Sequence, residues 1–168
     1  MLKGPATPKL HFRVVAIMLL LAGASAHAQD VNARDGEGAT ALLRAVWNED
    51  LTGVNTLLGK GAKVSIANAI GVTPAYVAAE HGNAAILRRL LDAGADVGTT
   101  DTSGDTLLMA SVRSGNPEAV RILLERGAKV NDAEPQYGHT ALMWAVRRND
   151  AAIMKLLLRQ GVGDVIAT

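Results

Sequence analysis

The stretch Thr73-Pro74-Ala75-Tyr76-Val77-Ala78-Ala79, followed by Gly94-Ala95-Asp96-Val97, decides the fold of this chain. Thr73 and Gly94 are 21 residues apart. The same spacing recurs from Thr40 to Gly61, from Thr106 to Gly127 and from Thr140 to Gly161. These four threonines lie 33, 33 and 34 residues apart. Four copies in register indicate a repeat architecture rather than a single irregular domain.

Each period predicts two helices. Threonine is a favoured N-cap, and Pro74 follows Thr73 at the first helical position, where a missing N–H costs nothing. An alanine-rich stretch predicts the first helix, and a leucine-rich stretch that ends at the Gly-Ala pair predicts the second. A helix pair of this size cannot bury its apolar surface alone, so neighbouring units must stack, and about three units are the minimum for stability.

A period near 33 in which Thr opens an Ala-rich helix and Gly-Ala closes a Leu-rich one resembles the ankyrin repeat. The resemblance covers nearly everything after Ala28. It implies a domain over 29–168 that is an all-α ankyrin-repeat solenoid of about four helix-turn-helix repeats with β-hairpin-like finger loops. The repeats lie at approximately 35–67, 68–100, 101–134 and 135–168. One extra residue within Ala133 to Gly138 predicts a longer or bulged fourth finger.

One position departs from the family pattern in every repeat. The family usually has His after Thr-Pro-Leu, whereas this chain has Leu43, Tyr76, Met109 and Met143. We therefore expect the hydrogen-bond network of that His to be absent or replaced by apolar packing. This change has no expected bearing on activity.

The two ends of the array are expected to differ. Residues 29–33 match the tail of a repeat with no helices ahead of it, and Gly53 lies inside the helix predicted from Leu51 to Gly59. Glycine costs about 1 kcal/mol against alanine in a helix interior, so the first repeat is expected to open first. The last repeat is expected to have a polar outer face, as a solenoid end requires, formed by Arg147, Arg148, Lys155 and Arg159.

Residues 1–28 have the three parts of a cleavable signal peptide. A basic front precedes an apolar run of 11 residues from Val14 to Ala24, and Ala26-His27-Ala28 then forms an A-x-A cleavage site. A membrane span needs roughly 20 apolar residues, so cleavage after Ala28 is favoured over a retained anchor. The compact signal and the Arg and Ala bias indicate a bacterium. We expect a mature chain in the periplasm, with no membrane association after cleavage.

Composition excludes several classes of function. The net charge of the full chain is +1, and without Lys3, Lys9 and Arg13 it is about −2, from 14 basic and 16 acidic residues. That balance is too weak to indicate a nucleic-acid or anionic-membrane partner. The chain has no cysteine, which excludes disulfides, thiol catalysis and thiolate metal sites.

No motif indicates an enzyme, a cofactor or a metal. His81 and His139 lack a second ligand three or four residues away on one helix face. Asp101-Thr102-Ser103-Gly104 is superficially similar to an aspartic-protease loop, but the repeat register accounts for its Asp and Gly. The carboxylates are dispersed rather than paired. A hydrolase with an unrecognised site is the rival interpretation.

The ankyrin resemblance implies that a partner binds the fingertips and the exposed ends of the first helices, a surface that includes Glu37 and Ala39. The predicted partner-binding residues are Trp47, Asn48, Ile70, Val72, Glu80, His81, Asp105, Arg113, Tyr137, His139, Arg147 and Arg148. Trp and Tyr dominate interface hot spots, but Trp47 could instead pack over the first repeat and Tyr137 could fill the enlarged finger. Arg113, Arg147 and Arg148 form either a basic rim or an ordinary solvated face.

The predicted function is a non-catalytic protein–protein interaction module in the bacterial periplasm. Its partner protein is unidentified, and binding is expected through the finger loops and the concave face of a monomer. The alternatives are an inhibitor or immunity protein against an exported toxin or enzyme, and an accessory factor that supports a periplasmic stress-defence enzyme. A structural role as a homo-oligomer is also open.

Overall fold

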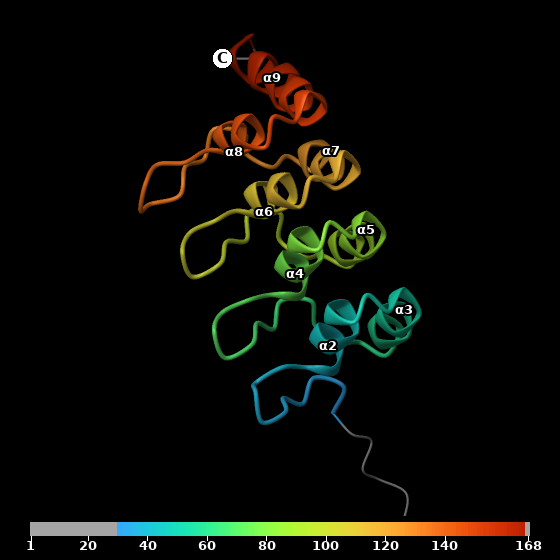
Figure 1. The fold of residues 1–168 in the computed structure, drawn as a ribbon. Coiled ribbons are helices and arrows are strands. Elements are labelled where there is room, and N and C mark those ends of the chain that lie inside the picture. Colours follow the sequence, from blue (N-terminus) through green and yellow to red (C-terminus); the bar gives the residue numbers. More distant parts are fainter. Residues whose placement is uncertain (1–29, 167–168) are drawn as a thin grey trace, which may run out of the picture. The chain divides into compact units, whose positions relative to one another are not determined.

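The computed structural model describes residues 30–166, with side chains to residue 161. The predicted signal peptide and its cleavage site lie outside the described residues. The described chain is all-helical, as predicted, and has no named strand (Figure 1). Its helices are α2 (Ala41–Trp47), α3 (Leu51–Gly59), α4 (Pro74–Glu80), α5 (Ala84–Asp92), α6 (Leu107–Ser114), α7 (Pro117–Glu125), α8 (Ala141–Arg147) and α9 (Ala151–Ile166).

The predicted threonine caps are confirmed. The Oγ1 atom of Thr40 accepts a hydrogen bond from the N–H of Leu43 at 3.2 Å, and Thr73, Thr106 and Thr140 cap their helices in the same way. The second helices begin at short polar side chains, which also satisfy free backbone N–H groups. These residues are Asp50, Asn83, Asn116 and Asp150. Local chemistry therefore fixes where each helix starts.

The helices stack in two rows. The first helices α2, α4, α6 and α8 pack against one another in that order, and so do the second helices α3, α5, α7 and α9. Figure 1 shows the first helices between the finger loops and the second helices. One continuous apolar cluster runs through the stack. Its fully buried members include Leu42, Leu87, Leu108, Ile122 and Leu157.

Polar side chains join neighbouring repeats at the period of the sequence. The side-chain amide of Asn116 donates to the carbonyl of Gly82 at 2.6 Å, and the two residues are 34 positions apart. Arg89 donates to the Oδ1 atom of Asn55 at 2.6 Å, again over 34 positions. Because each bond connects equivalent regions of adjacent repeats, these bonds support the register of the stack.

Each finger is organised by one side chain that accepts hydrogen bonds from the backbone of its own loop. Asp101 accepts from the N–H groups of Ser103 and Asp105, both at 2.9 Å. Asp35 and Asn68 hold the first two fingers with the same pattern. Short polar side chains of this kind commonly close such turns.

The fourth finger is longer, as predicted. Ala133 pairs with Thr140, whereas Thr100 pairs with Thr106 in the third repeat, so the loop between the paired residues gains one residue. Glu134 holds this loop, and its carboxylate accepts from the backbone N–H groups of Gln136, Tyr137 and His139. Glutamate is one methylene longer than the Asp or Asn of the other fingers, which suits the longer loop.

The expectation that the hydrogen-bond network between repeats is lost was wrong at Tyr76. The Tyr76 hydroxyl donates to the Oδ2 atom of Asp101 at 3.0 Å and accepts from Arg113 at 3.0 Å. Burial raises the pKa of Tyr76, so this hydroxyl stays protonated and keeps its donor. At Leu43 and Met109 the replacement by apolar packing is confirmed, because both side chains are buried.

For the last repeat one expectation was also wrong and another holds only in part. Gly161 does not end its helix, since α9 continues to Ile166; Val162 stands where the other repeats have alanine after the glycine. The predicted polar face of this repeat is incomplete. Its arginines are exposed, but so are apolar side chains at positions that the next repeat covers elsewhere. These are Met143 (50% exposed), Val146 (58%) and Leu158 (52%).

Candidate functional site

Four of the predicted residues form a row along the stack. Trp47, Glu80, Arg113 and Arg147 occupy the same position, seven residues after the capping threonine, at the ends of α2, α4, α6 and α8. Because these helices pack side by side, their ends form one continuous surface, which we term the helix-end row. Asn48 and Arg148 follow directly at its two extremes and are exposed.

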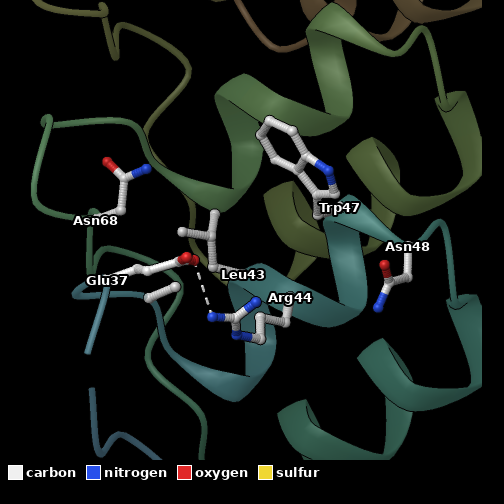
Figure 2. Close-up of a pocket in the computed structure, with 7 residues that line it drawn as sticks. Glu37, Leu43, Arg44, Trp47, Asn48 and Asn68 are labelled. Carbon is white, nitrogen blue, oxygen red and sulfur yellow. Dashed lines mark hydrogen bonds and ion pairs between the residues drawn. The ribbon is translucent and has the colours of Figure 1, made fainter. Parts of the chain in front are cut away.

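A pocket of about 360 Å³ lies at the first-repeat end of this row (Figure 2). Its lining comes from the first finger, helix α2 and the start of the second finger. The lining residues are Glu37, Ala39, Leu43, Arg44, Trp47, Asn48 and Asn68. The predicted surface included four of them, but Leu43 was expected in the core, and neither Arg44 nor Asn68 was singled out. A pocket between two fingers depends on how the repeats stack, which no single segment indicates.

Ion pairs set the electrostatics of the pocket. Arg44 donates to the Oε2 atom of Glu37 at 3.0 Å, as Figure 2 shows, and also pairs with Asp35. The hydrogen bond from Arg44 lowers the pKa of Asp35, so that carboxylate stays ionised. One guanidinium charge is therefore shared by two carboxylates at the wall of the pocket.

Trp47 is the most prominent aromatic side chain of this region. It is 58% exposed, and its ring makes a T-shaped contact with the His81 ring, with centroids 5.5 Å apart. The Nδ1 atom of His81 lies 3.7 Å from the Oε1 atom of Glu49. An apolar body beside polar groups is typical of side chains that serve as binding anchors.

A second cluster lies at the other end of the row. The ring of Trp144 is contacted by two guanidinium groups. The Cζ atoms of Arg113 and Arg147 lie 5.4 Å and 4.8 Å from its centroid. The ring of His139 lies 5.5 Å from Trp144 and 5.6 Å from Tyr137, which is largely exposed. Trp144 was not among the predicted site residues, and it occupies a helix position that is buried in the two preceding repeats.

Other predicted site residues are bonded within the protein. Arg113 pairs with Asp105 as well as with Tyr76, and Arg148 donates to the backbone carbonyl of Arg113 at 2.6 Å. The Nδ1 atom of His139 lies 3.1 Å from Glu134. In the second finger Ile70 is exposed, whereas Val72 is half-buried.

Two further searches concern only the part of the chain that the structure describes. Among residues 30–166, no three His, Asp or Glu side chains are placed to hold a metal ion. None of the helices in this part has the length and apolar content that a bilayer crossing requires.

Comparison with known proteins supports the assignment of the repeats. Residues 75–167 match the family model for ankyrin repeats, in three copies. No curated protein matches the chain. The match does not include the first repeat, although that repeat has the same pair of helices, α2 and α3. Ankyrin repeats are generally protein–protein interaction modules. Because the match spans more than half of the sequence, the chain belongs to the ankyrin-repeat family.

Proposed function

We propose that this protein is a non-catalytic periplasmic module that binds another protein through its finger loops and the helix-end row. The observation that supports this proposal is the chemistry of that surface. It presents exposed aromatic and apolar side chains, Trp47, Ile70 and Tyr137, beside exposed charged groups. Large aromatic side chains within a polar surround are typical of interface hot spots.

Capture of a partner tests the proposal. Residues 29–168 are immobilised and exposed to periplasmic extract, beside the triple variant Trp47→Ala, Tyr137→Ala, Arg147→Ala. The control triple variant Lys60→Ala, Lys155→Ala, Arg159→Ala changes exposed residues of the second helices or the turns that follow them. We expect a stoichiometric partner with the unmodified chain and the control, and its loss with the first variant.

Other outcomes contradict the proposal in defined ways. A partner retained by the first variant and lost by the control places the interface on the second helices. Failure to capture any protein contradicts the function itself. The identity of a captured protein separates the alternatives: an exported toxin or enzyme favours an inhibitor, and a stress-defence enzyme favours an accessory factor.

The periplasmic location has its own test. If residues 1–28 are a cleaved signal, mass spectrometry of the protein from the periplasmic fraction should find Gln29 at the N-terminus. An intact Met1 in the membrane fraction would contradict export by cleavage.

A further inference from the structure

The two tryptophans of the chain differ in one respect that indicates a ligand. Trp144 contacts the guanidinium groups of Arg113 and Arg147. In the described part of the chain no such contact is found at Trp47, which is 58% exposed and makes a T-shaped ring contact with His81. The protein therefore places its own arginines against the ring of Trp144 and leaves Trp47 largely exposed beside a pocket.

Three carboxylates lie in the pocket lining or at nearby positions of the chain and the helix-end row. Glu37 lines the same pocket and is largely exposed. Glu49 follows Trp47 by two residues. Glu80 occupies in α4 the position that Trp47 occupies in α2. The side chains of Glu49 and Glu80 are exposed. Arg44 is the one cation among the lining residues, and Asp35 and Glu37 share its charge. The pocket region therefore carries an excess of negative charge next to an aromatic face.

This combination selects a cation. An indole face attracts a guanidinium or ammonium group placed over the ring, and nearby carboxylates add Coulomb attraction. Guanidinium stacks on an aromatic face better than ammonium, because it is planar and less strongly hydrated. Asn48 and Asn68 line the same pocket and add polar atoms to its wall.

We propose that the pocket beside Trp47 binds an arginine-bearing segment of the partner protein, with the guanidinium group over the indole and its charge facing Glu49 and Glu80. This inference rests on the proposed function and adds the chemistry of the partner. It excludes an acidic segment at this end of the helix-end row, because three carboxylates would repel it.

Nuclear magnetic resonance tests the proposal without a known partner. The probe is a capped glycine pentapeptide with one central arginine, and its matched control has citrulline, a neutral side chain of the same shape. The indole N–H signals of Trp47 and Trp144 are followed in the ¹⁵N-labelled chain and assigned with Trp47→Phe. We expect the arginine peptide to shift the Trp47 signal with a Kd on the order of 1 mM, about fivefold tighter than the citrulline peptide.

Charge variants separate the cation site from non-specific binding. Glu49→Gln with Glu80→Gln should weaken the arginine peptide about threefold and leave the citrulline peptide unchanged. Glu125→Gln with Asp132→Asn changes the net charge equally at exposed positions elsewhere in the chain and should alter neither. Equal binding of both peptides, or no shift at Trp47 up to about 10 mM peptide, overturns the proposal.

The two proposals fail in distinguishable ways. If a protein is captured through the helix-end row but the arginine peptide does not shift Trp47, the cation site is wrong and the module function stands. If the peptide binds as expected but no protein is captured, the pocket chemistry stands and the module function fails.

Discussion

The outward-facing surfaces of the first and last repeats differ in chemistry: the first is charged and the last is partly apolar. In α2 the position four residues after the capping threonine holds Arg44, which is exposed and paired with Asp35 and Glu37. The same position holds the buried Val77 and Ala110 in the next two repeats. In the last repeat the apolar side chains on the opposite, outward-stacking side remain, and they are exposed.

The difference shows that the burial of a side chain in this fold depends on the neighbouring repeat as much as on the residue itself. Val146 is 58% exposed, whereas the equivalent Val46 and Val112 are fully buried beneath the next repeat. At the start of the array an ion-pair cluster replaces the outward apolar surface. In the last repeat, within the described residues, no ion-pair cluster takes the place of the apolar side chains. Exposed apolar groups of this kind mark a surface that another molecule can cover.

The largest expected effect on stability comes from the same substitution, Met to Ala, made at a covered position and at the equivalent uncovered one. Met109 is fully buried and Met143 is half exposed at the equivalent place. Met109→Ala should lower the free energy of unfolding by about 2–5 kcal/mol, because it leaves a cavity. Met143→Ala should change it by about 0.5 kcal/mol or less. Urea unfolding monitored by circular dichroism measures both values.

The result for Met143 also tests the expected monomer. A loss at Met143 as large as that at Met109 would show that the last repeat is covered in solution. Sedimentation of the unmodified chain would then reveal whether a second copy covers it.

The next largest expected effect is a difference in hydrogen exchange between the first repeat and the inner repeats. The first repeat has little buried surface in its second helix, where only Val54 of α3 is buried, whereas α5 buries Ile86, Leu87, Leu90 and Leu91. We expect amides in residues 29–60 to exchange faster than those in 73–124, because helices with few buried contacts open locally. Mass-spectrometric exchange measures this difference. Uniform protection across both segments would refute the ranking.

A smaller effect on stability is expected at the residue with positive φ that follows the first helix of each repeat, which is not glycine in the two end repeats. Gly82 and Gly115 have positive φ after the first helices of the inner repeats, and Glu49 and Asn149 replace them with φ of 55°. Left-handed backbone costs most residues roughly 1–2 kcal/mol, and asparagine less. Glu49→Gly should therefore raise the free energy of unfolding by about 0.5–1 kcal/mol, and Asn149→Gly by less.

Thermal unfolding of these variants beside Glu49→Ala provides the comparison. The alanine variant removes the carboxylate but keeps the side chain at positive φ, so it should not gain stability. Equal gains from glycine and alanine would show that charge, rather than backbone strain, is responsible.

The smallest effect concerns the fingers of the two ends. A hydrogen bond from Arg44 lowers the pKa of Asp35, and backbone hydrogen bonds, first that of His139, lower the pKa of Glu134. Both pKa values are lower in the folded state, so the stability they contribute is present above the ordinary carboxyl pKa values, 3.8 and 4.5. It is lost as the pH falls through the folded values.

Salt distinguishes the two causes. Added salt screens an exposed ion pair but affects buried backbone hydrogen bonds much less. Carboxyl carbon resonances should show the pKa of Asp35 rising with salt while that of Glu134 stays nearly constant. Arg44→Gln should raise the pKa of Asp35 alone. Equal salt shifts at both residues would contradict the assigned causes.

Sequence predicted the parts of this protein that depend on neighbouring residues in the chain. The starts of the first helices follow from threonine caps that act over three positions, and the α3 bounds were predicted as observed, from Leu51 to Gly59. The longer fourth finger was predicted because one residue was added to the repeat. These features are local, and a 33-residue period repeats them until the fold is evident.

Tertiary structure decided the features that join distant positions. The Tyr76 hydroxyl meets Asp101 and Arg113, which are 25 and 37 residues away, and Trp144 meets a guanidinium group from the preceding repeat. The pocket beside Trp47 exists because two fingers stack. Sequence periodicity places equivalent residues in register but does not state which polar atoms meet. Those contacts depend on side-chain reach across an interface that forms only when the repeats pack.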